Sequence, residues 1–430
     1  MLKHIFFLLS VSLFFSGCNN EDRELAKKIK EDGNFDKVQQ MALKVVKTGF
    51  NAGDGYGEVW IRDYNTFIEL SAKVYPKEVM KENLLVFFRL QGDDGNIIDG
   101  FVPQSKVVPS EGGYKWIYTD LEPTYCGMKN TVETDQETSL IQTVYKYIKA
   151  TGDRSILDEK VGDMTVADRM ELAVKFLQDK RWNDKYGLIW GATTADWGDV
   201  QQSDPWGVSL DENTKKAIDI YDNAMLLIAL ENLTEMVPGK KQKWQALHYS
   251  MAENTMKYLW DDKNQKFIPH LYLDGSPFPP DFDENKIFYH GGTAVAIEAG
   301  LLNKKQIKVS LDKMLENVKA SGAASIGLTL YPPYPEGFFE NKGMYPYGYQ
   351  NGGDWTWFGA RMIQQLVRYG FVKEAYENIQ PMTDRVIKNN GFYEWYTVDN
   401  KPEGSGTFRG SAGVLYKAIE MMDEWVSQNE

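Results

Sequence analysis

The feature that most constrains the fold is a weak internal repeat, in which a predicted helix ends in a polar turn that is followed by a short apolar or aromatic stretch. The four copies are FFRLQGDDGNIIDG (87–100), KFLQDKRWNDKYGLIWGA (175–192), KYLWDDKNQKFIPHL (257–271) and RVIKNNGFYEWY (385–396). Their wide, irregular spacing suits one copy for every one or two helical hairpins rather than a tight solenoid. We therefore expect a barrel of helical hairpins whose turns open at one end. Residues just after the turns, Asp99, Asp196, Asp199, His270 and Glu394, should then converge on one cleft.

The hydrophobic pattern agrees, because apolar residues recur with the 3.6-residue period of an amphipathic helix over most of the chain. The predicted helices tend to fall in pairs and cover 24–48, 64–75, 77–91, 135–150, 164–179, 215–236, 241–260, 290–300, 305–319, 355–369, 372–388 and 409–427. Strands of more than a few residues are not expected. This pattern predicts two concentric rings of helices.

The first residues, MLKHIFFLLSVSLFFSGC, have a positive start, a short apolar run and small residues before a cysteine. The run is too short to span a bilayer, which needs roughly 20 apolar residues, and is typical of a signal peptide. Ser16-Gly17-Cys18 resembles the lipobox of bacterial lipoproteins. We predict a signal peptide over 1–17, a lipidated Cys18 with a polar tether over 18–30, and one catalytic domain over 31–430, anchored in the bacterial cell envelope.

Composition argues against some classes of function and in favour of sugar binding. The net charge of −13 and the lack of a basic cluster argue against nucleic acid as a partner. The few histidines form no metal-binding motif, so neither a transition metal nor another cofactor is expected, although a single oxygen-ligated calcium stays open. The chain is expected to act as a monomer on an oligosaccharide. The 24 Tyr, 21 Phe and 12 Trp support this, because aromatic rings stack on the apolar faces of sugars.

Two acidic-aromatic segments could supply the pair of carboxyl groups that glycoside hydrolysis needs. TTADWGDVQ places Asp196 and Asp199 around Trp197, and GFYEWYTVDN places Glu394 between Tyr393 and Trp395. An apolar ring beside a carboxyl group can raise its pKa, so that it keeps a proton for use as a general acid. Either pattern alone is more often a turn or a helix cap than a catalyst.

Six motifs occur in the order found in six-hairpin glycosidases, a group that includes glucoamylases, neutral invertases, glycogen-debranching glucosidases and cellobiose-type phosphorylases. They are VWIRDY (59–64), VETDQETSLIQTVYKYIKATGD (132–153), TTADWGDVQ (193–201), YDNAMLLIAL (221–230), YQNGGDWTWFGARM (349–362) and GFYEWYTVDNKPEGSGTFRGSAG (391–413). The tail resembles the neutral invertases most closely. The resemblance implies an all-α (α/α)6 toroid with long loops and short β-hairpins over one end.

The resemblance also implies roles for individual residues. Glu394 matches the general base. Asp199 aligns with the acid of debranching glucosidases, whereas Asp196 competes when the phosphorylase pattern A-D-W-x-D is used, so both stay candidates. Arg62 and Asp63 match a W-x-R-D motif that holds sugar hydroxyls. The full set of expected sugar-binding residues is Trp60, Arg62, Asp63, Asp135, Trp197, Tyr221, Gln350, Asn351, Trp355 and Trp395.

The expected activity is hydrolysis of an α-glucoside or related oligosaccharide with inversion. One departure from the invertases is an insertion, DPWGVSLDENTKKAID (204–219), which puts sucrose specificity in doubt and is expected to shape outer subsites. Three alternatives stay open: a disaccharide phosphorylase, with GSGTFRGSAG and Arg409 cradling an anion; a polysaccharide lyase; and a glycan-binding lipoprotein without turnover.

Overall fold

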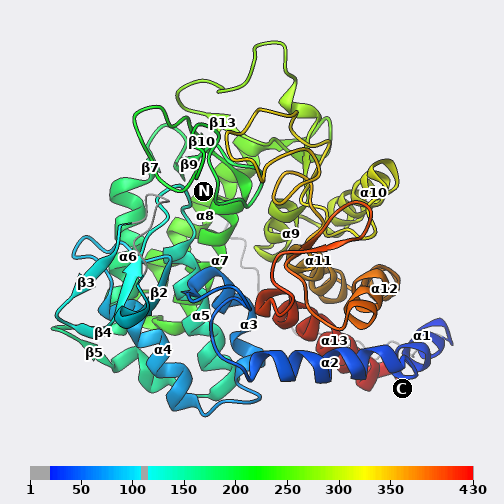
Figure 1. Cartoon of the computed structure of the whole chain (residues 1–430), viewed down its shortest axis with the longest axis horizontal. Coiled ribbons are helices and arrows are strands. Elements are labelled where there is room, and N and C mark those ends of the chain that lie inside the picture. Colours follow the sequence, from blue (N-terminus) through cyan, green and yellow to red (C-terminus); the bar gives the residue numbers. More distant parts are fainter. Residues whose placement is uncertain (1–19, 108–114, 430) are drawn as a thin grey trace, which may run out of the picture.

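In a computed structural model of the chain, which describes residues 20–107 and 115–429, helices form two concentric rings (Figure 1). The inner ring closes on itself, because each of its helices packs on the next and the last packs on the first. Its members in the described chain are α3 (Ile61–Ser71), α5 (Gln136–Thr151), α7 (Ile220–Met236), α9 (His290–Glu298), α11 (Thr356–Arg368) and α13 (Arg409–Asn429). This confirms the predicted (α/α)6 toroid.

The outer helices pack against the inner ring. They are α2 (Gly33–Val46), α4 (Lys77–Arg89), α6 (Val166–Lys180), α8 (Lys241–Leu259), α10 (Lys304–Ser321) and α12 (Val372–Asn389). Sequence decides which ring a helix joins. Inner helix α7 is buried at every position from Ile220 to Leu230, whereas outer helix α6 buries one face that includes Met170, Ala173 and Leu177.

The predicted helices are confirmed, and most boundaries agree to within two residues. The helix predicted over 64–75 lies at Ile61–Ser71 as α3, and two further helices differ at their starts or in their continuity. The predicted helix over 24–48 is broken at residue 32, where Asp32 caps α2 by accepting a hydrogen bond from the backbone N–H of Asn34 at 3.1 Å. The predicted helix over 215–236 starts late, because residues 216–218 pair as strand β10 and Asp219 caps α7.

Residues 20–30 of the predicted tether instead form helix α1 (Asn20–Lys30), which buries Ala26 and Ile29 and packs on α13. The reason is an apolar stripe in an otherwise charged segment. The predicted signal peptide and Cys18 lie outside the described residues. Within the described residues, no helix is long and apolar enough to cross a membrane.

A four-stranded antiparallel sheet was not predicted. Its order is β1 (Val59–Trp60), β2 (Gly100–Pro103), β4 (Glu122–Met128) and β3 (Ile117–Thr119). The longest strand, β4, reads EPTYCGM, and its proline, glycine and polar residues hide the alternation by which a strand is recognised.

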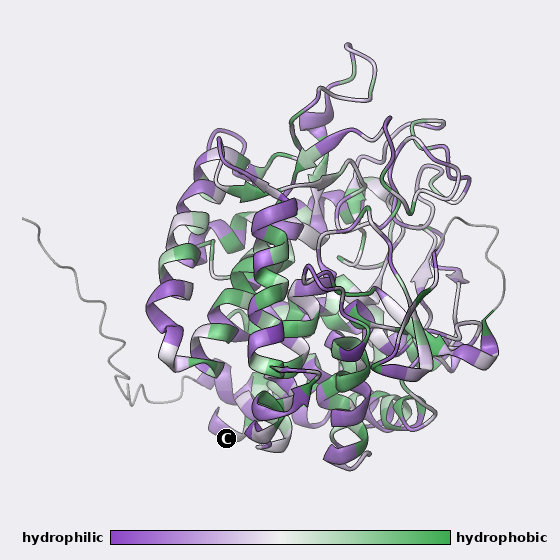
Figure 2. Cartoon of the chain, turned by 90° about the vertical axis from the view of Figure 1, so that its left-hand side faces the viewer, coloured by the Kyte–Doolittle hydropathy of each residue, from purple (hydrophilic) through white to green (hydrophobic). Residues whose placement is uncertain are grey.

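Short strands follow several outer helices, as the repeat predicted. The pairs are β7 (Trp182–Asn183) with β8 (Leu188–Ile189), β11 (Trp260–Asp261) with β12 (Lys266–Phe267), and β16 (Trp395–Tyr396) with β17 (Pro402–Glu403). Elsewhere β5 (Lys160–Val161) pairs with β6 (Met164–Thr165), β14 (Phe288–Tyr289) with β15 (Leu330–Tyr331), and β10 (Lys216–Ile218) with both β9 (Gly191–Ala192) and β13 (Leu271–Tyr272). Figure 2 shows helices side by side and long loops gathered toward one side of the molecule.

Candidate active site

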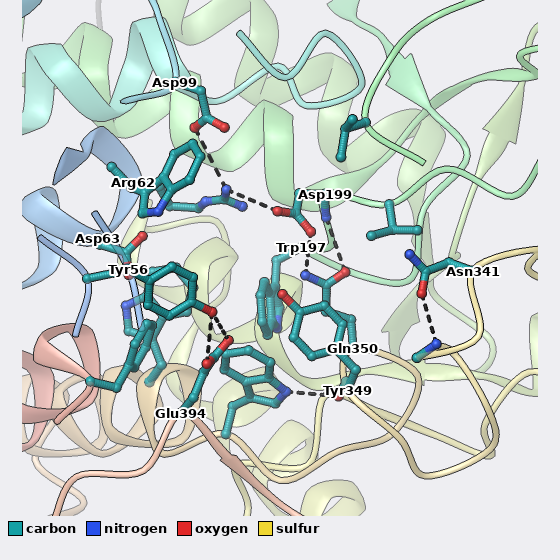
Figure 3. A pocket seen from close by; sticks show the side chains of 18 of the residues that line it. Tyr56, Arg62, Asp63, Asp99, Trp197, Asp199, Asn341, Tyr349, Gln350 and Glu394 are labelled. Carbon is teal, nitrogen blue, oxygen red and sulfur yellow. Dashed lines mark hydrogen bonds and ion pairs between the residues drawn. The ribbon is translucent and has the colours of Figure 1, made fainter. Parts of the chain in front are cut away.

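A cavity of about 440 Å³ draws its walls from loops that are far apart in the sequence. Its lining includes Tyr56, Trp60, Arg62 and Asp63 before and at the start of α3, Asp99 before β2, and Trp197, Asp199, Trp206, Asn341, Tyr349, Gln350, Trp355, Trp357 and Glu394 from later loops and the start of α11 (Figure 3). Of the carboxylates that the repeat predicted to converge, Asp99, Asp199 and Glu394 do so. The predicted sugar-binding residues Trp60, Arg62, Asp63, Trp197, Gln350 and Trp355 also line the cavity.

Arg62 is the centre of charge in this cavity. Its guanidinium contacts Glu133 and lies 3.6 Å from Asp199 Oδ2, 3.7 Å from Asp135 Oδ2 and 4.0 Å from Asp99 Oδ1. Burial disfavours the charged guanidinium, but the surrounding carboxylates outweigh burial and raise its pKa. The arginine therefore neutralises carboxylates that would otherwise repel one another.

Asp63 and Asp99 are buried carboxyl groups at the same end of the cavity. Burial raises the pKa of Asp63 to about 8 and that of Asp99 to about 7, and in both cases Arg62 opposes the shift. Asp63 therefore holds a proton near neutral pH. One oxygen of each side chain, Oδ1, has no hydrogen-bond partner in the protein. Buried polar atoms without partners are costly, so these oxygens are suited to bind the hydroxyls of a ligand.

Glu394 is held on the other side of the cavity by Tyr56. The Tyr56 hydroxyl lies 2.9 Å from both Oε1 and Oε2, and the backbone N–H of Ser405 donates to Oε2 at 3.2 Å. Burial raises the pKa of Glu394, while the two hydrogen bonds lower it. A carboxylate whose pKa is raised toward neutrality is a stronger base than an ordinary one.

Asp199 faces the cavity from the loop after β9. Gln350 Nε2 donates to Asp199 Oδ1 at 2.6 Å, and Asn130 Nδ2 donates to the Asp199 carbonyl at 2.9 Å. The Asp199 side chain is 22% exposed, against 2% for Asp99 and 3% for Glu133, two other carboxylates that contact Arg62. Asp199 is thus fixed in position and still open to a ligand.

Asp196 points away from the cavity, although it lies only three residues earlier. Its backbone adopts a φ of 56°, and its carboxylate accepts hydrogen bonds from the backbone N–H groups of Gly291 and Gly292, both at 2.7 Å. These donors are in the first turn of α9, where a carboxylate is favoured. Asp196 therefore ties its loop to the inner ring, and of the two acid candidates only Asp199 lines the cavity.

Several expected residues lie outside the cavity lining. Tyr221 donates to Asp135 at 2.7 Å, and Asp135 in turn lies 3.7 Å from the Arg62 guanidinium. Asn351 is fully buried and bonds to the backbone of Tyr334 and Met344, because its loop folds back on itself. Trp395 is also buried beside the cavity rather than in its lining.

Two further expectations are corrected. His270 lies 2.9 Å from Glu284 and is not part of the cavity lining, because this contact holds its ring outside the cleft. Arg409 of the GSGTFRGSAG segment donates to Asn51 and Thr48 instead of facing an anion site.

The hydroxyls of the same GSGTFRGSAG segment are also occupied. Ser405 Oγ and Thr407 Oγ1 donate to Asp54 Oδ1 at 2.5 and 2.8 Å. These hydroxyl bonds, with burial opposing them, lower the pKa of Asp54 to about 2. The segment therefore cradles a carboxylate of the protein itself.

Four lining residues, Tyr56, Tyr349, Asn341 and Trp206, were not among the predicted site residues, although the insertion that holds Trp206 was expected to shape outer subsites. Trp206 had a usable signal, because it is a tryptophan inside a polar insertion. Tyr56 had none, since its role depends on a partner 338 residues away in the sequence. Among the described residues, no group of three or more His, Cys, Asp or Glu side chains is arranged to hold a metal ion.

Comparison with known proteins settles the family. The profile of the glycosyl hydrolase 94 superfamily catalytic domain matches residues 44–396, most of the chain. The chain belongs to the glycosyl hydrolase 94 superfamily. This superfamily membership and the toroid together confirm the resemblance to six-hairpin glycosidases.

This glycosyl hydrolase 94 superfamily member is 24% identical over 201 residues to N,N'-diacetylchitobiose phosphorylase of Vibrio furnissii. The match covers 44% of the chain but only 23% of that relative's length. Among solved structures, GH63 mannosylglycerate hydrolase of Thermus thermophilus has a similar fold (TM-score 0.64, 16% identity, 88% of this chain and 99% of that one). A rhamnosidase of Klebsiella oxytoca also has a similar fold (TM-score 0.58, 12% identity), and the match covers 90% of this chain and 63% of that one.

Proposed function

We propose that the protein is an inverting glycoside hydrolase that acts on an α-glucoside or a related short oligosaccharide. The observation that carries this proposal is the position of Glu394, a buried carboxylate oriented by Tyr56 across the cavity from Asp199 (Figure 3). Two carboxyl groups that flank one cavity are the minimum equipment for single displacement.

In the proposed reaction, Asp199 gives its proton to the glycosidic oxygen as the bond from that oxygen to the anomeric carbon breaks. A water molecule attacks the anomeric carbon from the opposite face, and Glu394 takes the proton that this water loses. The products are a sugar of inverted anomeric configuration and the free alcohol. Inversion calls for a separation of about 6.5 to 9.5 Å between the two carboxyl groups, which leaves room for the water.

We assign the sugar that is released to the buried end of the cavity. Arg62, Asp63 and Asp99 are each less than 8% exposed there and present charged and unpartnered polar atoms to a ligand. Trp355 and Trp357 supply apolar surface beside them. Because this end is closed, we infer removal of a terminal sugar rather than cleavage inside a chain.

A phosphorylase is the second candidate, and the Vibrio furnissii relative favours it. The charge of the cavity favours hydrolysis instead. Of the described residues that line the cavity, Arg62 is the only basic one, and carboxylates already surround it, so the lining offers no further cation to hold a phosphate ion beside Glu394. A phosphate ion would be repelled from the position that Glu394 occupies.

The test is to incubate the protein with α-linked glucose disaccharides, with and without phosphate, and to follow the products by NMR. Hydrolysis predicts that phosphate changes neither rate nor products and that the first sugar released has inverted configuration. Glu394→Gln should lower kcat at least about 100-fold while the sugar still binds. A sugar phosphate as product would establish the phosphorylase instead. Binding without any turnover would favour the glycan-binding lipoprotein.

We also propose that Cys18 carries a lipid and anchors the enzyme in the bacterial cell envelope. The support is the lipobox-like Ser16-Gly17-Cys18 after a short apolar run. Metabolic labelling with a palmitate analogue, compared between the natural chain and Cys18→Ser, tests this, and equal labelling of the two would refute it.

A further inference from the structure

The open end of the cavity has a character unlike its buried end. Trp206 lines it and is 56% exposed, whereas the tryptophans of the cavity floor, Trp197, Trp355 and Trp357, are at most 3% exposed. Val208, Asn341 and Gly343 line the same end. In Figure 3, Asn341 lies on the far side of Asp199 and Gln350 from Arg62 and Asp63. The proposed acid thus stands between the buried end and this outer end.

The loop that carries Trp206 is held by its own hydrogen bonds. Asp204 Oδ1 accepts from the backbone N–H groups of Trp206 and Gly207 at 2.6 and 2.7 Å, and the backbone N–H of Gln201 donates to Gly207 O at 2.9 Å. Gly207 has a φ of 74°, which other residues rarely adopt. Trp206 is therefore exposed although its backbone is fixed.

A second loop braces the first. Glu340 N donates to the carbonyl of Gln202 at 3.0 Å, and Asn341 Nδ2 donates to the carbonyl of Trp206 at 3.4 Å. Since Nδ2 has two hydrogens, the other can serve a ligand hydroxyl. An exposed indole next to an amide donor is a suitable pair for a sugar ring, which offers an apolar face and a rim of hydroxyls.

We propose that Trp206 and Asn341 form the subsite for the leaving group, and that this subsite takes a second, uncharged sugar ring. The inference rests on the proposed function, because it needs Asp199 to protonate the oxygen between the two rings. None of the described residues that line this end, Val200, Trp206, Val208, Asn341 and Gly343, is charged. A leaving group with a carboxylate, such as glycerate, would find no counter-ion here. The substrate class is then a neutral disaccharide or the end of a neutral oligosaccharide.

The experiment compares α-D-glucosyl fluoride, α-linked glucose disaccharides and α-glucosylglycerate as substrates of the natural enzyme and of Trp206→Ala. The fluoride has no leaving-group ring, so it reports on the buried end and on Glu394 alone. For Trp206→Ala we expect about a 10-fold lower kcat/KM on the best disaccharide and an unchanged value on the fluoride. Trp206→Phe should recover most of the loss, and Tyr249→Ala, which removes an exposed aromatic ring from α8, should change neither value.

Calorimetric binding of the same disaccharides to Glu394→Gln, with and without Trp206→Ala, tests the leaving-group subsite separately from the proposed hydrolase function. Weaker binding in the double variant supports the subsite even if the natural enzyme cleaves nothing, an outcome that would defeat the proposed function alone. Three outcomes would overturn the subsite and leave hydrolysis standing, provided that the natural enzyme cleaves the fluoride. They are an equal loss of kcat/KM on the fluoride and the disaccharide in Trp206→Ala, no loss on either substrate, and a preference of the natural enzyme for glucosylglycerate over every disaccharide.

Discussion

The Tyr56 hydroxyl lies 2.9 Å from each carboxylate oxygen of Glu394, so a single phenol orients the proposed base. Burial raises the pKa of Glu394, and the hydrogen bond from Tyr56 opposes this rise. Burial and the proximity of the carboxylate in turn raise the pKa of Tyr56, which stays protonated and keeps donating. The pair sets the pH at which Glu394 can accept a proton.

Tyr56→Phe should therefore move the acidic limb of the pH profile of kcat/KM to higher pH by about one unit, the worth of one hydrogen bond to a charged group. The sign follows because Glu394 acts as a base only when ionised, and losing the donor raises its pKa. A matched control is Tyr272→Phe, which removes the same kind of bond from Tyr272 to Glu284 outside the cavity. A shift to lower pH in Tyr56→Phe would contradict the assignment of Glu394 as base.

Asp199→Asn and Asp196→Asn should fail in different ways. Asp199→Asn removes the proton donor, so kcat on a disaccharide should fall about 100-fold or more while α-glucosyl fluoride, whose leaving group needs little protonation, is still cleaved. Asp196→Asn should instead lower the free energy of unfolding by about 1 to 3 kcal/mol. The asparagine amide has only one oxygen, so its NH2 group would oppose the backbone N–H of either Gly291 or Gly292.

Chemical denaturation and steady-state kinetics on both variants measure these effects. If Asp196→Asn kept its stability but lost activity on the disaccharide alone, the roles of the two residues would be reversed.

Asp63→Asn should raise the stability of the fold at neutral pH and weaken sugar binding. The pKa of Asp63 is about 8 in the folded protein, above its ordinary value of 3.8, so the folded state binds more protons than the unfolded state between these values. Stability is therefore lost as pH rises across that window, and Asn removes this loss. We expect a Tm increase of about 2 °C or more at pH 8 and a smaller one at pH 4.

Asp54→Asn is a control of opposite sign, because the pKa of Asp54 is lowered to about 2. Its carboxylate contributes stability above pH 3.8 that is lost as pH falls through 2, so the asparagine variant should be less stable at neutral pH. Thermal unfolding across pH 4 to 8 distinguishes the two variants, and a lower Tm for Asp63→Asn at pH 8 would argue against the raised pKa.

Arg62→Ala should be strongly destabilising, by about 3 to 5 kcal/mol, because Asp99, Glu133 and Asp135 would be left buried without their partner. Arg62→Lys keeps the charge and should recover part of this stability, but not the sugar affinity, since an ammonium group lacks the planar fork of donors. Denaturant unfolding and calorimetric sugar binding measure the two effects. Natural sugar affinity in Arg62→Lys would show that Arg62 only balances charge.

Much of the architecture was predictable because helices depend on local patterns. The 3.6-residue period located the helices to within a few residues, and the repeated turns after α4, α6, α8 and α12 indicated hairpins with one common open end. The sheet around β4 was not predictable, since Pro123, Gly127 and polar residues interrupt its alternation and its stability comes from pairing with β2.

The residue types of the site could likewise be predicted from the sequence, but the orientation of each side chain relative to the cavity could not. Asp196 and Asp199 flank the same tryptophan, so the sequence does not distinguish them. The positive φ of Asp196 and its two N–H donors on α9, 95 and 96 residues away, turn the Asp196 side chain away from the cavity, whereas the Asp199 side chain faces it. The contact of Tyr56 with Glu394 and the position of Trp206 at the open end of the cavity likewise depend on contacts between distant segments. The sequence by itself determined the helices, the ring and the kinds of side chain near its open end, because these follow from local periodicity and residue chemistry. The tertiary structure alone decided which carboxylates face one another, because that depends on contacts between segments far apart in the chain.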